Sequence, residues 1–384
     1  MNQSISSERN YGIDLLKVIS MFFVVNLHLL GLGGILTSFP GDNASFWTAW
    51  LLEIAMLCAV NCFAMATGYL MADRSFRYRK MIPMWLTVQL YSVLIMMISY
   101  QFYLKDISYL AWLSYLLPVT APYYWYFTAY FGLFFFIPFA NILIASMSRK
   151  QHFILLFTGF LLFSVSGIVN FGNLNNKDSF NLSGGYSMWW LLYLYFVGAG
   201  IKKYNFFMSL HRLQALAGYG CMVGLTFLSK FLIHRILARY DQFLPYSYYL
   251  SVYGEDRFTP YLSPTILLSG LFLMVFCLKT PVPRWLHRPL KWISPMLFQV
   301  YVIHAHPSVC AVIYNGFTAF STYSPIVLTA CVLAVSLGIF IGCICIDWFR
   351  LQLFRLLRIE KLVDCAADWF NAKARCVFAV FEKI

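Results

Sequence analysis

Long apolar stretches are the feature that most limits what this chain can fold into. A helix needs about 20 mostly apolar residues to cross a bilayer, and about ten windows of the sequence meet that requirement. They are approximately 15–36, 46–71, 81–103, 124–146, 153–171, 187–201, 213–233, 262–278, 294–315 and 325–348. Only 11% of the residues are charged, too few to cover a globular domain with a polar surface. We therefore predict an all-α, polytopic integral membrane protein rather than a soluble enzyme.

The positive charge of the chain indicates its orientation in the membrane. If the N-terminus lies in the cytoplasm, most of the 28 Lys and Arg residues fall in segments on the inner side. This distribution predicts that both termini are cytoplasmic, and it accounts for the net charge of +13 without a nucleic-acid partner. We expect a membrane domain over residues 1–349 and a tail over 350–384. The tail alternates apolar and basic residues at helical spacing, which favours an amphipathic helix lying on membrane lipids.

Ionisable residues in the first predicted span are the strongest candidates for a site, because charge inside a bilayer is costly. Lys17 and His28 are 11 residues apart, so they share one face of a helix and lie about 16 Å apart along its axis. His28 is a candidate general base, although a His can also form a quiet hydrogen bond between helices. Lys17 could equally be an anchor at the membrane surface, and Asp14 could pair with it.

A carboxyl group in the second predicted span is a candidate partner for His28. Counted by helical rise from the outer end of its own span, Glu53 lies at about the same depth as His28. The hypothesis is that Glu53 orients or charges the imidazole of His28. The alternative is a protonated carboxyl bonded to a neighbouring helix.

A dense basic cluster precedes the third predicted span on the cytoplasmic side. It includes Arg77, Arg79 and Lys80, and Pro83 follows it. Such a cluster suits a ligand that carries several phosphates. It is also what the positive-inside rule produces without any ligand.

The ninth predicted span contains His304 and His306, followed by Pro307. On a regular helix these two imidazoles point in nearly opposite directions, so they share a pocket only if Pro307 distorts the backbone. We expect no metal site, because no third ligand accompanies them.

Two groups on the outer side leave alternatives open. The cations His234, Arg235, Arg239 and Arg257 could hold an anionic sugar or a lipid phosphate, or could simply be solvated. Aromatic residues gather in 109–126 and 240–261, as either an interfacial belt or a platform on which sugar rings stack.

The motifs of this chain resemble those of the membrane acyltransferase-3 family, which includes bacterial O-acetyltransferases of surface polysaccharides. Lys17, ten residues and His28 match the hallmark of the family's first helix. Thr67-Gly68-Tyr69-Leu70 is similar to its Ser-Gly-Tyr/Phe-Leu signature, with Thr in place of Ser. Further matches are Arg77-Tyr78-Arg79, Trp125-Tyr126-Phe127, Phe196–Ile201 and Tyr301-Val302-Ile303-His304.

The resemblance implies a multi-pass enzyme of the bacterial cytoplasmic (inner) membrane. It implies transfer of an acetyl group from cytoplasmic acetyl-CoA to a hydroxyl of a polysaccharide or of a lipid-linked sugar, with no further cofactor. Lys17 and His28 would be the catalytic pair, and Arg77 and Arg79, with Lys80 beside them, would bind the donor. Glu53 is the third catalytic candidate, as the partner of His28. Further candidate site residues are Asp14, Thr67, Tyr69, Trp125, Tyr126 and His304. The competing interpretation is a transporter or flippase for a polysaccharide or lipid-linked sugar.

Overall fold

A computed structural model describes residues 9–73, 81–102, 108–119, 122–169, 180–240 and 254–359, together with residues 361, 365, 368 and 369. Most of this part of the chain is helical, and it contains no β-strand. The predicted all-α polytopic membrane protein is therefore confirmed. The basic residues Arg77, Arg79 and Lys80 and most of the predicted tail lie outside the described residues.

A helix, or a pair of helices, occupies each of the apolar windows. The helices are α1 (Tyr11–Gly31), α2 (Ala44–Met56), α3 (Ala59–Met71), α4 (Met81–Phe102), α5 (Tyr109–Leu116), α6 (Trp125–Ser146), α7 (Arg149–Gly159), α8 (Ser166–Val169), α9 (Met188–Tyr204), α10 (Arg212–Tyr240), α12 (Pro264–Lys279), α13 (Arg284–Ile293), α14 (Leu297–His304), α15 (Pro307–Ile313) and α16 (Pro325–Leu356). In the described chain, seven helical segments are long and apolar enough to span a membrane, or up to eight if the bent segment from Arg284 to Thr322 is one span. The helices α9 and α12 are shorter, with 17 and 16 residues. The count of ten spans remains a prediction.

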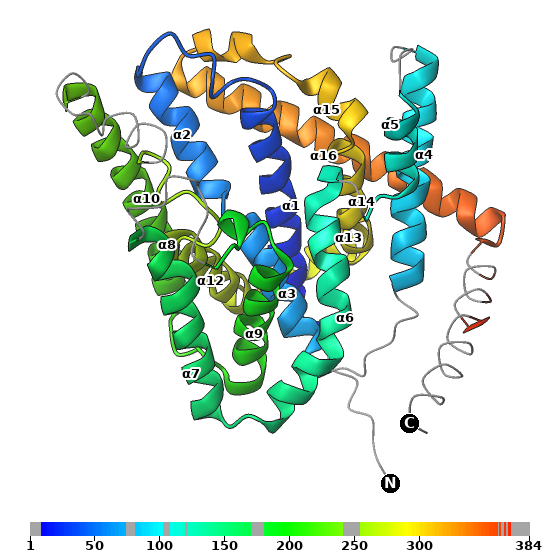
Figure 1. Cartoon of the computed structure of the whole chain (residues 1–384), viewed down its shortest axis with the longest axis horizontal. Coiled ribbons are helices and arrows are strands. Elements are labelled where there is room, and N and C mark those ends of the chain that lie inside the picture. The colour runs from blue at the N-terminus through cyan, green and yellow to red at the C-terminus, as the bar shows by residue number, and fades with distance from the viewer. Residues whose placement is uncertain are drawn as a thin grey trace.

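Helix α1 lies near the centre of the bundle, with α7 and α10 toward one side and α4 and α5 toward the other (Figure 1). Its start is fixed by Asn10, whose side chain accepts hydrogen bonds from the backbone N–H groups of Gly12 and Ile13. It packs against α2, α3, α12, α14 and α16. The first helix is therefore placed where several others can form a common site with it.

Two glycines allow α3 and α9 to pack with their backbones in contact. A Cβ atom at Gly68 would collide with the carbonyl of Tyr195, and one at Gly198 would collide with the carbonyl of Met65. Small residues commonly permit this close approach between membrane helices. Gly68 and Gly198 belong to the motifs Thr67–Leu70 and Phe196–Ile201 described above. Part of the resemblance to the family therefore reflects helix packing.

Three features of the helices differ from simple straight spans. The second span breaks at Leu57 and Cys58, between α2 and α3. The chain bends by 70° between the segments that end at His304 and begin at Pro307, as expected where a proline removes a backbone donor. Helix α16 continues without a break through residue 350 to Leu356, so the expected boundary between membrane domain and tail falls within a helix.

Candidate active site

A cavity of about 640 Å³ lies between α1, α3, α4, α6, α14 and α16. One stripe of α1 lines it, formed by Lys17, Met21, Val24 and His28. These positions recur every three or four residues, which is the spacing of a single helical face. The predicted alignment of Lys17 with His28 is therefore confirmed, and both side chains face the same cavity.

The imidazole of His28 is held by a second imidazole from a distant part of the chain. Nδ1 of His28 lies 3.0 Å from Nε2 of His304, and Nδ1 of His304 lies 2.5 Å from the carbonyl oxygen of Val300. A carbonyl only accepts, so Nδ1 of His304 carries the proton and its Nε2 is the acceptor. Nδ1 of His28 is therefore the donor to His304.

This chain of hydrogen bonds determines which nitrogen of His28 is basic. With its proton on Nδ1, a neutral His28 has a free lone pair on Nε2. In the described part of the chain no group hydrogen-bonds to Nε2 of His28. His28 lines the cavity, whereas His304 is 1% exposed and does not line it. His304 is therefore placed where it can orient His28, as a carboxylate orients the histidine in serine hydrolases.

Pro307 separates the two histidines of the ninth window. His306 is the N-cap of α15: its Nδ1 accepts a hydrogen bond from the backbone N–H of Ser308. Its Nε2 lies 3.1 Å from the carbonyl of Ser92. Both ring nitrogens of His306 are thus used in packing, and only His304 reaches His28.

Glu53 does not orient His28 in this structure. It is not among the residues that line the cavity, and its charged neighbours are Asp256 and Lys230. Counting residues along α2 (Ala44–Met56) gives the depth of Glu53 but not the direction in which its side chain points. Helix α2 packs against α10, which places Glu53 beside a different group of charges.

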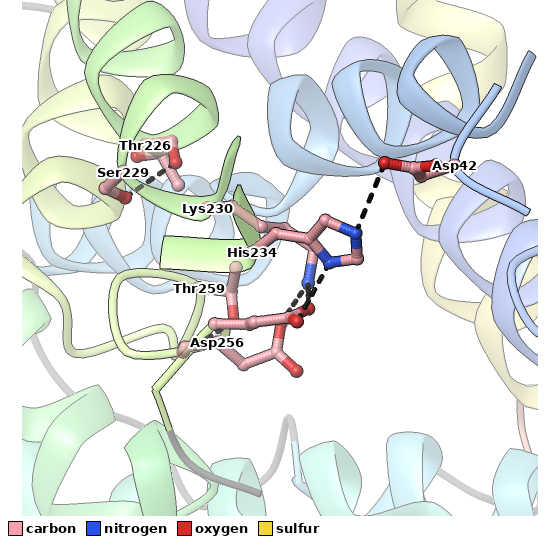
Figure 2. A network of polar contacts seen from close by, with 8 residues as sticks. Asp42, Thr226, Ser229, Lys230, His234, Asp256 and Thr259 are labelled. Atoms are coloured by element: carbon pink, nitrogen blue, oxygen red, sulfur yellow. Dashed lines mark hydrogen bonds and ion pairs between the residues drawn. The ribbon is translucent and has the colours of Figure 1, made fainter. Parts of the chain in front are cut away.

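That group is an ion-pair network between Asp42, just before α2, residues of α10, and the segment after Gly254. Figure 2 shows Lys230 and His234 of α10 together with Asp42 and Asp256. Lys230 is only 2% exposed, and its Nζ lies 2.7 Å from Asp256 and 3.5 Å from the centre of the Trp50 ring. His234 lies between Glu255, at 2.9 Å, and Asp42, at 3.6 Å.

These pairs change the interpretation of the outer cations. Arg235 contacts Asp42 at 3.3 Å, and Nε of Arg257 donates to the carbonyl of Ile168 at 2.6 Å. His234 and Arg235 contact carboxylates and do not line the cavity, so the structure gives the idea that they hold an anionic sugar no support. The network instead joins α10 to the segments that contain Asp42 and Asp256.

The Lys17 end of the cavity contains a second fixed polar group. Asp14 is buried and pairs with Arg9 at 2.6 Å, not with Lys17 as the sequence suggested. Its other oxygen accepts from the hydroxyl of Ser294 at 2.7 Å, and Ser294 lines the cavity beside Lys17. Asp14 thus fixes part of the cavity wall through Ser294, and among the described residues no ion pair engages Lys17, which leaves it available to a ligand.

Aromatic residues form the other end of the cavity. Trp125, Tyr126, Tyr130 and Tyr261 line it, and the rings of Trp125 and Tyr261 lie nearly parallel, 5.9 Å apart. The backbone of Tyr261 is held by Asn61, whose amide donates to its carbonyl at 2.8 Å. Burial raises the pKa of Tyr261 well above its usual range, so its phenol stays a neutral donor.

The signature of α3 contributes one residue to the cavity. Thr67 lines it, and its hydroxyl donates to the carbonyl of Phe63 at 3.0 Å. Tyr69 does not line it; its hydroxyl lies 3.4 Å from the Asn10 side chain, and Lys202 lies over its ring. Tyr69 therefore has a packing role near the start of α1.

The cavity also contains polar groups that sequence reasoning missed. The hydroxyl of Tyr301 and the amide oxygen of Gln299 are buried without a hydrogen-bond partner in the described part of the chain. Both residues line the cavity. Buried polar atoms are usually satisfied, so these two are suited to contact a ligand.

Comparison with known proteins provides one match. The model of a family described as an acyltransferase domain matches residues 10–345. That segment includes nearly every helix that forms the cavity. No curated protein and no solved structure matches the chain.

Proposed function

The chain belongs to the acyltransferase-3 family, and from that premise we propose that it is a membrane O-acetyltransferase of the bacterial inner membrane. It takes the acetyl group of cytoplasmic acetyl-CoA and transfers it to a sugar hydroxyl of a cell-envelope or exported polysaccharide. The observation that carries the proposal is that His28 lines the cavity with its Nδ1 bonded to His304, which leaves its Nε2 without a partner among the described residues.

The chemistry follows from the protonation of that atom. Nε2 of His28 removes the proton of the sugar hydroxyl, and the oxygen attacks the thioester carbonyl. The C–S bond then breaks, and the departing CoA sulfur takes the proton from His28. The imidazolium formed between these steps keeps its Nδ1–H bond to His304, so the ring does not turn.

The two ends of the cavity suit the two substrates. The donor would enter at the end that holds Lys17, and its pantetheine arm would extend along α1 toward His28, about 16 Å away by helical rise. The acceptor would lie against Trp125, Tyr126 and Tyr261. Aromatic rings offer the apolar face of a sugar a flat surface, and the neutral phenol of Tyr261 offers it a hydrogen bond.

A covalent route uses the same nitrogen. If Nε2 attacked the thioester itself, an acetyl-histidine would form and CoA would leave before the acceptor reacted. Mixing the purified protein with donor alone separates the routes. CoA released in one equivalent without acceptor marks the covalent route, and no release marks direct transfer.

The test of the function is the acetyl content of the envelope polysaccharide, measured by NMR. We expect the acetyl signal to disappear when the gene is deleted and to stay absent when His28→Ala is expressed at the wild-type level. His211→Ala, which changes an exposed histidine, is the matched control and should restore the signal. An unchanged acetyl signal in the deletion strain would refute the proposal. Polysaccharide export that decreases while the acetyl content of the exported polymer is unchanged would favour the transporter instead.

A further inference from the structure

An arginine beyond the family-matched segment forms part of the cavity wall. The match to the family ends at residue 345, but α16 continues to Leu356 and brings Arg350 and Phe354 to the cavity. The first turns of α4, at Pro83, Met84 and Thr87, line the same cavity. From its sequence alone, Arg350 belongs to a basic tail on the membrane surface; in the structure it faces the interior.

The guanidinium of Arg350 is fixed by Asp347 on one side and by Phe354 on another. Its Nε and Nη2 donate to the two oxygens of Asp347, at 2.6 and 3.1 Å. Asp347 is 0% exposed and also accepts from the hydroxyl of Tyr91 on α4, at 2.7 Å. On its other side the guanidinium lies 5.0 Å from the centre of the Phe354 ring.

This arrangement leaves donors of Arg350 unused. Arginine has five N–H donors in a rigid fork, and Asp347 engages only Nε and Nη2. Among the described residues no acceptor is bonded to Nη1. A preorganised guanidinium in a cavity is well suited to a phosphate, because little side-chain entropy is lost when the ligand binds.

We infer that Arg350 binds a phosphate group of the CoA thioester donor, with Asp347 and Tyr91 as the residues that position it. This inference rests on the proposed function, since it assumes that the donor is acetyl-CoA. It adds a donor-binding residue outside the family-matched segment. The alternative source of the same chemistry is the phosphate of a membrane lipid.

The test compares two donors that differ in their phosphates. Acetyl-CoA carries phosphate groups, whereas S-acetylpantetheine has the same thioester arm but no phosphate. Binding of each is measured by calorimetry on the full chain in nanodiscs. Arg350→Met alone leaves Asp347 as a buried unpaired carboxylate, which can destabilise the fold. The decisive variant is therefore the double substitution Asp347→Asn/Arg350→Met, and Arg355→Met, an exposed arginine of the same helix, is the matched control.

We expect the double variant to bind acetyl-CoA about 10- to 100-fold more weakly, the range for losing a charge-assisted hydrogen bond. Its affinity for S-acetylpantetheine should stay within about twofold of wild type, as should both affinities of Arg355→Met. Tyr91→Phe should show a smaller loss with the same preference for acetyl-CoA.

Three results would contradict the inference in distinguishable ways. If the wild-type protein binds acetyl-CoA and the double variant binds it equally well, Arg350 is not a donor-binding residue and the proposed function is unaffected. If both donors weaken equally, and the loss depends on anionic lipid in the nanodisc, Arg350 binds a lipid phosphate. If the wild-type protein binds neither donor, the proposed donor is wrong and the inference fails with it.

Discussion

Replacing His304 with phenylalanine should remove the basic nitrogen of His28 without removing His28. The substitution preserves an aromatic ring of similar size in a buried position but eliminates the acceptor that lies 3.0 Å from Nδ1 of His28. Without that acceptor, nothing holds the proton on Nδ1. His28 can then carry its proton on Nε2 or rotate its ring. In either case Nε2 no longer presents a lone pair to the sugar hydroxyl.

The expected magnitude follows from the role of each ring. A general base contributes about 10²- to 10⁴-fold to a rate, so His28→Ala should lower kcat by that factor. An orienting residue behind the reactive group contributes about 10- to 100-fold, so His304→Phe should cost less than His28→Ala. His304→Gln retains a side-chain acceptor and should keep more activity than His304→Phe.

The assay follows transfer of radiolabelled acetyl from acetyl-CoA to the native acceptor in inverted membrane vesicles, with each variant at equal abundance. The decisive comparison is the double variant His28→Ala/His304→Phe. Because His304 acts only through His28, its substitution should cause no further loss once His28 is gone. Affinity for acetyl-CoA should be unchanged in all of these variants.

Two results would refute this reasoning. If His304→Phe lowered activity in the His28→Ala background by the same factor as in wild type, His304 would act on the protein independently of His28. If His304→Phe were fully active, the hydrogen bond between the rings would have no part in catalysis.

Three further predictions concern packing and the acceptor. Asp256→Asn should lower the free energy of unfolding by about 1–3 kcal/mol, because it leaves the buried Lys230 ammonium without its closest carboxylate. Lys230→Met should destabilise the protein less, since the Asp256 side chain that it leaves unpaired is 57% exposed. Equal losses for the two variants in thermal unfolding would contradict this prediction. Gly198→Ala should destabilise the protein by about 1–3 kcal/mol, because the added Cβ clashes with a carbonyl of α3. Gly31→Ala is the control and should leave the stability unchanged, because a Cβ at that position meets nothing within 4 Å. Thermal unfolding of both variants checks this prediction. Trp125→Ala should raise KM for the sugar acceptor by about tenfold, because ring stacking is lost, and should leave KM for acetyl-CoA unchanged. An increase in KM for acetyl-CoA alone would show that the acceptor binds elsewhere.

Much of the fold was predictable because the apolar windows determine where helices form in a membrane. The common face of Lys17 and His28 was predictable for the same reason, since helical periodicity places both on one stripe. The surroundings of Glu53 were not, because counting residues along one helix gives a depth but does not show which neighbouring helix the side chain faces.

The partner of His28 could not be identified from the pattern of its own helix. His304 is 276 residues away, and periodicity within one helix contains no information on which helix packs against it. Helical geometry predicted that His304 and His306 would point apart unless Pro307 distorted the backbone, but it did not indicate which of the two would reach His28. Arg350 was obscured by a different effect: its basic, amphipathic surroundings are typical of a surface tail, and only the packing of α16 against α1 and α14 shows that it faces the cavity.

The most direct measurement of the central claim is the protonation state of His28 itself, read by NMR from isotope-labelled histidine ring nitrogens. The chain has seven histidines, so the His28 signals can be assigned by their loss in His28→Gln. The account predicts a proton on Nδ1 and a bare Nε2, with the proton becoming mobile between the two nitrogens in His304→Phe. A proton found on Nε2 of the wild-type protein would contradict it, because that nitrogen could then neither accept the sugar proton nor attack the thioester.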